Sequence, residues 1–200
     1  MIYLMRHAEA DTNGKRFVGQ WDVPLTPRGR AQARRWAQRL STVAFTAVFS
    51  SDLSRAADTA AILGGDRAVK TVASLREIQL GRWEGRLMSD VQHRDPQAWE
   101  ERGRRIDGFR PPGGESFADL QDRVVPAFEH LIETVSDPVL IVSHAGVNRA
   151  LLCHLLGMPL TNLFRLGQDV GALNLIDRQR RKTVVAAVNL NPFRPEEACG

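Results

Sequence analysis

Five side chains that could act on a phosphate ester stand beside short apolar segments of the sequence. Arg6 and His7 directly follow the apolar run "IYLM", and His144 directly follows "PVLIVS". Arg55 lies near the start of a predicted helix, and Glu77 follows a short predicted strand. A neutral imidazole is a nucleophile, guanidinium groups bind phosphate oxygens in pairs, and a carboxylic acid protonates a leaving alkoxide. These five residue types together suit phosphoryl transfer.

Each of these side chains has a candidate role. His7 is the candidate nucleophile, because the charge of Arg6 and Arg55 opposes its protonation and keeps its lone pair free. The free N–H groups of the helix that follows His144 offer an anion site, and Glu77 is the candidate general acid. A metal site of His7, Glu77 and His144 is an alternative, but the two arginines beside it would repel a dication.

Alternating strands and helices are predicted to position these residues. Thr26 is predicted to cap a helix from Pro27 to about Leu40, because threonine is a good N-cap and proline suits the first helical position. Pro126 is expected to kink a later helix or to mark a junction. After the first strand "IYLMR", strands are predicted at 46–51, 69–74, 138–144, 171–177 and 183–190, and helices at 53–65, 115–135 and 145–157.

This alternation predicts an α/β fold, a three-layer α/β/α sandwich with a mainly parallel central sheet. The carboxyl ends of parallel strands lie at one edge of a sheet, where ligands bind in such folds, so we expect the two histidines, two arginines and Glu77 at one rim. The segments 171–177 and 183–190 are predicted to form a final hairpin of edge strands. Residues from about 82 to 114, polar and either irregular or short-helical, are interpreted as a lid-like insertion in a single domain spanning 1–200.

The composition is ordinary for a soluble globular enzyme, with 43% hydrophobic and 25% charged residues. No apolar run approaches the roughly 18 residues of a membrane span, and the N-terminal segment has no signal-peptide features, so we expect a cytoplasmic protein that binds no membrane. The net charge is +4, but the arginines are scattered and the aromatic residues do not alternate with them, which argues against nucleic-acid binding. Cys153 and Cys199 lie in settings too different for a framework disulfide.

Five segments in chain order resemble the histidine phosphatase, or phosphoglycerate mutase-like, superfamily. They are "RHAEADTN", "RFVGQWDVPLTPRGRAQA", "SSDLSRAADTA", "LREIQLGRWEG" and "SHAGVNR". The resemblance spans nearly the whole chain and implies a phosphoglycerate mutase-like fold. It also implies that His7 is the phosphorylated nucleophile, that Glu77 is the proton donor, and that Arg6, Arg55 and His144 bind phosphate.

The same resemblance implies further contacts with the substrate. Asn13, Gly19, Gln20 and Ala145 occupy the corresponding segments and are expected to contact the phosphate ester. The resemblance implies no metal and no other cofactor. The expected partner is therefore a small phosphate monoester, and a homodimer stays open.

Two positions depart from the family pattern. Ala8 replaces the usual glycine, and a methyl group there is harmless if the backbone φ is negative. Ala10 stands where the family usually has Ser or Thr, which puts one auxiliary contact in doubt. The core roles are unaffected by either change.

The remaining histidines are interpreted as structural. His93 and His130 fall in polar or amphipathic helical context, and His154 is expected to pack within an apolar helix. A Cys153–His154 nucleophile pair is excluded, because adjacent side chains diverge on a helix.

Within the family, the sequence favours a phosphatase over a mutase. The family's phosphoglycerate mutases carry a longer Lys- and Arg-rich insertion that this chain lacks. The segments "VGQWDVPLTPRG" and "PPGGESFADLQDRV" resemble α-ribazole phosphatases of cobalamin biosynthesis. Related broad-specificity phosphatases share most of this likeness, so both substrate assignments stay open, as does a phospho-ligand-binding module without activity.

Overall fold

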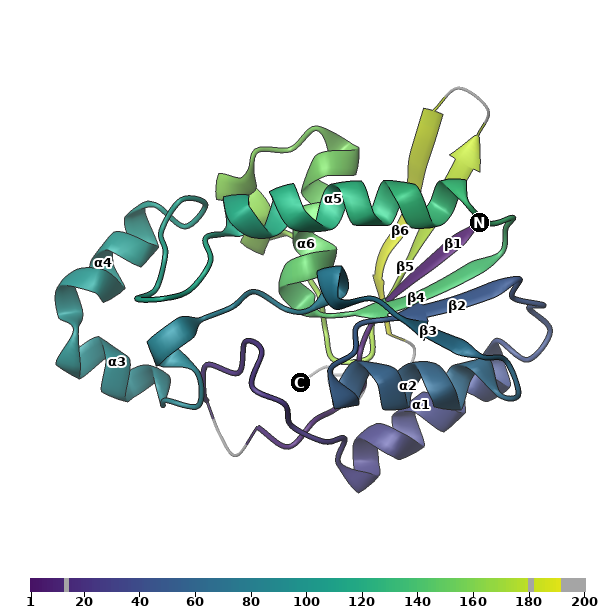
Figure 1. Cartoon of the computed structure of the whole chain (residues 1–200), viewed down its shortest axis with the longest axis horizontal. Helices are drawn as coiled ribbons and strands as arrows, with labels where there is room; N and C mark the ends of the chain where they lie inside the picture. Colours follow the sequence, from purple (N-terminus) through teal and green to yellow (C-terminus); the bar gives the residue numbers. More distant parts are fainter. Residues whose placement is uncertain (13–14, 180–181, 192–200) are drawn as a thin grey trace, which may run out of the picture.

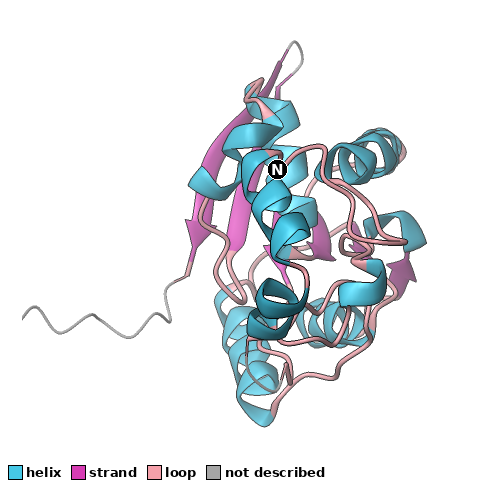
Figure 2. Ribbon diagram, turned by 90° about the vertical axis from the view of Figure 1, so that its left-hand side faces the viewer, coloured by secondary structure: helices cyan, strands magenta, loops and turns pink. Residues whose placement is uncertain are grey.

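The computed structural model describes residues 1–12, 15–179 and 182–191. Its centre is a six-stranded sheet in the order β3-β2-β4-β1-β5-β6, which lies between two layers of helices (Figures 1 and 2). The strands are β1 (Ile2–Arg6), β2 (Ala47–Ser50), β3 (Val69–Thr71), β4 (Val139–Ser143), β5 (Leu173–Gln179) and β6 (Lys182–Leu190). The predicted α/β sandwich is confirmed.

Four of these strands form the parallel part of the sheet. β2 pairs in parallel with β3 and with β4, and β4 pairs in parallel with β1. The register of the β1–β4 pair sets Arg6 opposite Ser143, so the two chain segments that carry the histidines leave the sheet side by side. The mainly parallel sheet expected from the sequence is therefore present.

The last two strands are antiparallel, and the prediction that both lie at an edge is wrong for β5. β5 pairs with β1 on one side and with β6 on the other, so it is an interior strand. Its residues Leu173, Asn174 and Ile176 are buried. The apolar and polar residues of "GALNLID" do not reveal this position, because a buried polar side chain such as Asn174 interrupts the continuous apolar run that an interior strand usually shows.

The helices follow the predicted boundaries closely. Thr26 caps α1, its Oγ1 accepting a hydrogen bond from the Gly29 N–H at 2.9 Å. The long helix α5 passes through Pro126 without a junction. The helices are α1 (Pro27–Arg39), α2 (Ser54–Gly64), α3 (Met88–Arg94), α4 (Pro96–Arg104), α5 (Phe117–Glu133) and α6 (Ala145–Leu156), with short 3₁₀ turns at Ala73–Leu75, Gly81–Trp83 and Leu160–Arg165. The strand predicted at 69–74 is shorter, because its end enters the first of these turns.

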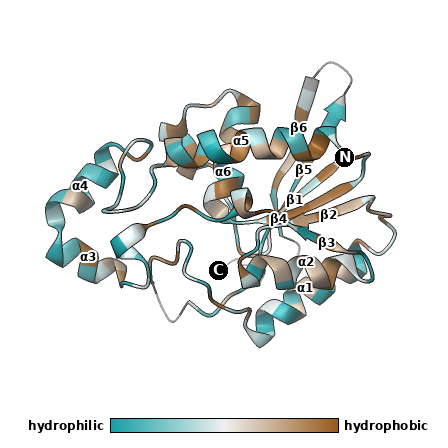
Figure 3. Ribbon diagram, viewed as in Figure 1, coloured by the Kyte–Doolittle hydropathy of each residue, from teal (hydrophilic) through white to brown (hydrophobic). Residues whose placement is uncertain are grey.

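The sheet buries a separate apolar cluster on each face. Leu4 and Ile141 face α5 and α6, whereas the next residues, Met5 and Val142, face α1 and α2. This is the alternation expected of strands buried on both sides. Figure 3 shows hydrophobic residues concentrated on the central strands, between the helices that cover them.

A third, smaller cluster supports the segment that the sequence analysis interpreted as an insertion, which we call the insertion (residues 82–114). Phe17, Trp83 and Val91 form this cluster, and none of them belongs to the two clusters of the sheet. In Figure 1 the helices α3 and α4 of the insertion lie beyond the carboxyl ends of the strands. The insertion is thus held by its own contacts at the end of the molecule where the candidate residues gather.

The other histidines lie outside the candidate site, and one prediction about them is wrong. His154 does not pack in an apolar setting: its side chain is 42% exposed, and its Nε2 lies 3.4 Å from Glu129 Oε1. It occupies the last turn of α6, where the ring reaches the outer side of the contact with α5. His93 and His130 are exposed, as expected. Cys153 is buried with a free thiol, whereas Cys199 lies outside the described residues.

None of the helices in the described part of the chain is both long and apolar enough to cross a membrane.

Candidate active site

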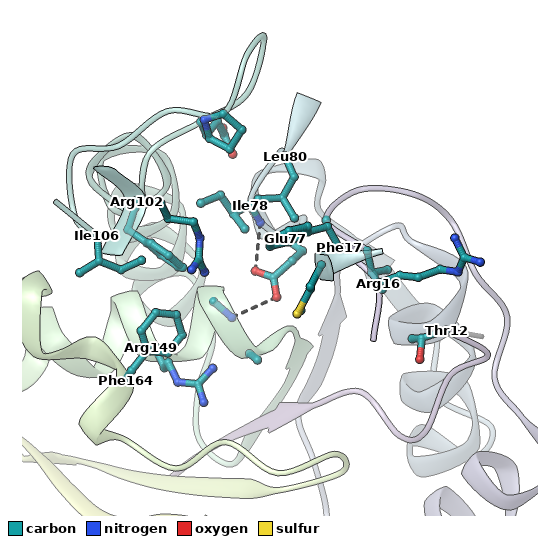
Figure 4. Close-up of a pocket in the computed structure, with 18 of the residues that line it drawn as sticks. Thr12, Arg16, Phe17, Glu77, Ile78, Leu80, Arg102, Ile106, Arg149 and Phe164 are labelled. Atoms are coloured by element: carbon teal, nitrogen blue, oxygen red, sulfur yellow. Dashed lines mark hydrogen bonds between the residues drawn. The ribbon is translucent and has the colours of Figure 1, made fainter. Parts of the chain in front are cut away.

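A pocket opens at the carboxyl edge of the parallel strands. It encloses about 970 Å³ of space, part of which is continuous with solvent. Arg6, His7, Arg55, Glu77 and Ala145 all contribute to its lining, although they come from four separate segments of the chain. The rim predicted from strand direction is therefore present. Figure 4 shows this pocket, with the insertion forming part of its wall.

His7 lies at the bottom of the pocket as a neutral imidazole. Burial lowers its pKa well below the ordinary value of 6.5, and the charges of Arg6 and Arg55 lower it further. Its Nδ1 lies 2.8 Å from the carbonyl oxygen of Ala8. Because a carbonyl oxygen only accepts hydrogen bonds, Nδ1 must carry the hydrogen and donate it. The lone pair is then on Nε2, which is the ring nitrogen that can act as a nucleophile.

His144 lies next to His7 but beneath the surface of the pocket. The two ring centroids are 5.2 Å apart. The residue is fully buried, and burial is the largest cause that lowers its pKa well below 6.5, followed by the neighbouring His7 and Arg55. Among the residues that the structure describes, neither ring nitrogen of His144 has a hydrogen-bond partner. A neutral imidazole with an unsatisfied N–H is an available donor for an oxygen atom at this position.

The two arginines are fixed by backbone carbonyl groups and not by carboxylates. Arg6 Nη1 donates to the carbonyl oxygen of Gln168 at 2.6 Å. Arg55 donates from Nη1 to Trp21 O at 3.0 Å and from Nη2 to Gly19 O at 2.8 Å. These bonds orient both guanidinium groups, and neither group forms an ion pair with a carboxylate in the described residues, although the charge of Glu77 acts on both. The Nε atoms of Arg6 and Arg55 are both buried and have no hydrogen-bond partner in the described part of the chain.

A buried polar network holds the backbone to which Arg6 is bound. Ser143 Oγ donates to Asn148 Oδ1 at 2.5 Å, and Asn148 Nδ2 donates to Gln168 Oε1 at 3.0 Å. The Gln168 amide in turn donates to Asn174 Oδ1 at 2.7 Å, and Asn174 Nδ2 donates to the carbonyl oxygen of Leu4. All four side chains are buried, and satisfied buried networks of this kind make a site rigid.

Glu77 lines the same pocket as His7 and is held by two backbone N–H groups. Its Oε2 accepts from Gly146 at 3.0 Å, and its Oε1 accepts from Ile78 at 3.0 Å (Figure 4). Gly146 is required here, because a Cβ atom at that position would come within 2.3 Å of Glu77 Oε1. One of the helix N–H groups that the sequence analysis assigned to an anion is therefore bound to Glu77.

The predicted contact residues Gly19 and Gln20 serve mainly to hold the site. Gly19 has a positive φ of 54° and lines the pocket, and its carbonyl oxygen is bound to Arg55. Gln20 is not part of the lining; its side-chain amide donates to the backbone carbonyl of Glu77 at 3.1 Å. Ala145 lines the pocket, and Asn13 lies outside the described residues.

The alanine in the place of the usual glycine fits without strain. Ala8 is fully buried and its φ is negative. Its N–H donates to Thr59 Oγ1 at 3.1 Å. The methyl group is accommodated in the apolar cluster beneath α1 and α2.

The pocket also contains residues that the sequence analysis did not single out. Arg102 and Ile106 reach it from the insertion, and Arg149 and Phe164 line it from the side of α6 (Figure 4). Arg149 could have been found, because it lies four residues after Ala145 and so shares a helix face with it. The residues of the insertion carry no such periodic signal.

No group of three or more His, Cys, Asp or Glu side chains gathers to hold a metal ion in the residues that the structure describes. The alternative metal site of His7, Glu77 and His144 is thus not supported. Both carboxylate oxygens of Glu77 are bound to backbone N–H groups.

Five buried side-chain nitrogen or oxygen atoms lack a hydrogen-bond partner within the described ranges, and four of them lie in this site. They are the Nε atoms of Arg6 and Arg55 and both ring nitrogens of His144. A neutral imidazole, two unpaired guanidinium groups and a carboxyl group at the edge of a parallel sheet define a class of protein: an α/β protein with a histidine-centred anion pocket.

Comparison with known proteins identifies the family. Residues 2–191 match the family model described as "Histidine phosphatase superfamily (branch 1)". The chain therefore belongs to the histidine phosphatase superfamily, which confirms the resemblance found in the sequence.

The relatives include several phosphatases of different names. The chain is 36% identical to glucosyl-3-phosphoglycerate phosphatase of Mycolicibacterium vanbaalenii, over 83% of this chain and 78% of the relative. It is 31% identical to phosphoserine phosphatase 1 of Hydrogenobacter thermophilus, over 94% and 92%. The solved structure of the α-ribazole phosphatase from Shigella flexneri superposes with a TM-score of 0.87 at 30% identity, covering 94% of this chain and 96% of that one. These relatives agree with a phosphoric monoester hydrolase.

Proposed function

We propose that this protein is a phosphomonoesterase that works through a phosphohistidine intermediate on His7 and needs no metal ion. The observation that carries the proposal is the group of four unsatisfied nitrogens of Arg6, Arg55 and His144 around a neutral imidazole. Unsatisfied buried polar groups are costly, so their concentration at one place indicates a ligand that satisfies them. Three of these nitrogens can donate to an anion, namely Nε of Arg6, Nε of Arg55 and the one N–H of neutral His144, and a phosphoryl group presents three acceptor oxygens.

The first step transfers the phosphoryl group to the enzyme. The lone pair of His7 Nε2 attacks phosphorus, and the bond from phosphorus to the alcohol oxygen breaks on the opposite side. Arg6, Arg55 and His144 bind the three remaining oxygens, whose charge is spread in the transition state. Glu77, in its acid form, gives its proton to the leaving alkoxide, so a neutral alcohol departs.

The second step returns the enzyme to its starting state. Glu77, now a carboxylate, accepts a proton from a water molecule whose oxygen attacks the phosphorus of phosphohistidine. The nitrogen–phosphorus bond breaks, its electron pair returns to His7 Nε2, and inorganic phosphate leaves. The hydrogen on Nδ1 stays bound to the Ala8 carbonyl throughout, which keeps the same ring nitrogen available in each cycle.

The natural substrate is defined by the alcohol that is esterified to the phosphate, and several alcohols are candidates. The sequence likeness and the fold comparison support α-ribazole 5′-phosphate as a candidate, which would place the enzyme in cobalamin biosynthesis. Relatives of comparable identity are named for glucosyl-3-phosphoglycerate and for phosphoserine, and these support the alternative of a different or broader small-molecule specificity. A phosphoglycerate mutase and a phospho-ligand-binding module are the remaining alternatives.

Trapping of the intermediate tests the proposal. Wild type and His7→Ala are mixed with a ³²P-labelled phosphate ester, quenched in alkali and treated with acid. We expect an acid-labile, alkali-stable label on the wild type that is absent from His7→Ala. His93→Ala, which changes an exposed histidine outside the pocket, is the matched control and is expected to keep the label.

Three outcomes would contradict parts of this proposal. Absence of label and turnover in the wild type would favour the binding module, and label that persists in His7→Ala would place the nucleophile elsewhere. Transfer of the label to a second substrate hydroxyl, in place of release as inorganic phosphate, would identify a mutase. Turnover of a panel with α-ribazole 5′-phosphate, glucosyl-3-phosphoglycerate and phosphoserine then ranks the candidate substrates.

A further inference from the structure

The pocket has more positively charged side chains than are required to bind one phosphate group. Five arginines and two glutamates contribute to its lining. Arg6 and Arg55 are assigned above to the phosphoryl group, and Arg16 donates to the carbonyl oxygen of Gly85. Arg102 and Arg149 remain, and both reach the pocket from the same side, next to Ile106 and Phe164 (Figure 4).

Arg102 is partly buried and has no acidic partner. Its guanidinium carbon lies 5.7 Å from the ring centre of Phe17 and 6.0 Å from that of Trp99. No hydrogen bond or ion pair joins it to any residue of the described segments, and burial alone lowers its pKa. The rings orient the guanidinium group by cation–π contact while its N–H groups stay available.

Unlike Arg102, the neighbouring arginines of the same segment form ion pairs. Arg104 pairs with Glu100 at 3.2 Å and Arg105 pairs with Glu101 at 3.5 Å, each across one helical turn. The residue four positions before Arg102 is Ala98, which cannot form such a pair. Arg102 is thus the arginine of α4 that faces the pocket, and it is left without a carboxylate.

Arg149 provides a second cation on the same side of the pocket, from helix α6. Its Nε donates to the carbonyl oxygen of Leu166 at 3.0 Å, and its guanidinium carbon lies 5.2 Å from the ring centre of Phe164. These contacts fix the side chain but do not neutralise it. Burial is the largest cause that lowers its pKa.

The acidic residues of the lining form no ion pair with these two arginines in the described part of the chain, although the charges of Glu77 and Asp169 oppose the lowering of the Arg149 pKa. Glu115 forms a two-point ion pair with Arg123, at 2.9 Å for each bond. Glu77 accepts its hydrogen bonds from Gly146 and Ile78, and we assign its proton to the leaving group. The walls between the cations are otherwise largely apolar, so an unpaired charge there is poorly solvated.

We propose that the alcohol released from the substrate carries a carboxylate, which binds Arg102 and Arg149. This inference rests on the phosphatase activity proposed above and narrows its substrate class to phosphorylated carboxylic acids with some apolar surface. A guanidinium group matches a carboxylate with two parallel hydrogen bonds. A carboxylate also suits this wall better than a second phosphate, because one charge costs less to remove from water than two. A neutral riboside such as α-ribazole leaves both arginines unsatisfied.

Matched pairs of substrates test the inference. One pair is 3-phosphoglycerate and glycerol 3-phosphate, which differ in a carboxylate against a hydroxymethyl group. The other pair is 4-carboxyphenyl phosphate and 4-methylphenyl phosphate, in which a ring sets the carboxylate further from phosphorus. For at least one pair we expect the wild type to have a kcat/KM at least about tenfold higher for the carboxylated member, since a hydrogen bond to a charged group is worth this much.

Substitutions in α4 assign that preference to one side chain. Arg102→Gln is expected to bring the ratio within a pair close to one, and Arg102→Lys, which keeps the charge, to retain part of it. Arg104→Gln removes a charge from an exposed position of the same helix and is expected to leave the ratio unchanged. Circular dichroism and the melting temperature check that each variant is folded.

The outcomes separate the two proposals. Turnover of p-nitrophenyl phosphate by the wild type, together with equal rates within both pairs, refutes the carboxylate and leaves the phosphatase intact. A preference that survives in Arg102→Gln, or that Arg104→Gln lowers equally, also refutes it. Absence of turnover on every substrate refutes the phosphatase activity, and the carboxylate inference fails with it.

Discussion

Replacement of Gly146 by alanine is expected to disable proton transfer from Glu77 while the rest of the site stays in place. The new Cβ atom would stand 2.3 Å from Glu77 Oε1, whereas ordinary contacts begin at 3.4 Å. The carboxyl group must therefore retreat by about 1 Å, and its hydrogen bond from the residue 146 N–H is strained. A misplacement of about 1 Å in a reacting group can lower a rate by about 10².

The leaving group makes this loss specific. Glycerol 3-phosphate releases an alkoxide that needs a proton, whereas p-nitrophenyl phosphate releases a phenolate that leaves without one. Rapid-quench experiments with enzyme in excess follow the transfer to His7 alone. We expect the Gly146→Ala rate to fall about 10²-fold on glycerol 3-phosphate and far less on p-nitrophenyl phosphate.

A second glycine in a helix provides the control. No atom lies within 4 Å of a Cβ placed on Gly103 in α4, so Gly103→Ala is expected to keep both rates. The reasoning about Glu77 would be refuted by a folded Gly146→Ala protein that keeps its rate on glycerol 3-phosphate, or that loses equal rate on both substrates.

Three further outcomes are expected. Glu77→Gln keeps the size of the side chain but cannot release a proton, so its rate on glycerol 3-phosphate falls by roughly 10² to 10⁴ and its rate on p-nitrophenyl phosphate falls much less; equal losses would point to another donor. EDTA leaves the turnover of p-nitrophenyl phosphate unchanged, and a loss that Mg²⁺ or Zn²⁺ restores would contradict the metal-free mechanism. The pKa values of His7 and His144 are lowered in the folded protein, so the unfolded chain binds more protons below about pH 6.5 and stability falls as the pH decreases through that value. The melting temperature is therefore expected to fall less steeply between about pH 7.5 and 5.5 in His144→Gln than in the wild type, and identical slopes would count against this assignment.

The sequence predicts the chemistry of this site better than its surroundings, for a physical reason. Strand direction alone brings Arg6 and His144 to one rim, because both follow parallel strands. The hydrogen bond between Glu77, in a loop, and Gly146, in the first turn of α6, joins segments far apart in the chain, and no local pattern predicts it. His154 shows the same limit, since the apolar residues around it in the sequence do not reveal that its ring is exposed.

The insertion shows why the substrate is harder to predict than the reaction. Its position over the pocket depends on contacts such as Phe17 with Trp83, whose ring centres are 5.2 Å apart. Such contacts have no periodicity in the sequence, unlike the alternation of Leu4 and Met5 in β1. The orientation of Arg102 toward the pocket follows from this packing and not from the helix pattern alone.

The separate apolar cluster of Phe17, Trp83 and Val91 has a consequence for how this protein could diverge. Because its buried members belong to neither cluster of the sheet, substitutions there act on the local opening of the insertion before they act on global unfolding. Evolution or protein engineering can therefore change the insertion, which we propose selects the alcohol, while the residues proposed to bind the phosphate stay unchanged. The residues proposed to select the alcohol and those proposed to act on the phosphate thus lie on different segments of the chain, so relatives of similar identity need not share a substrate.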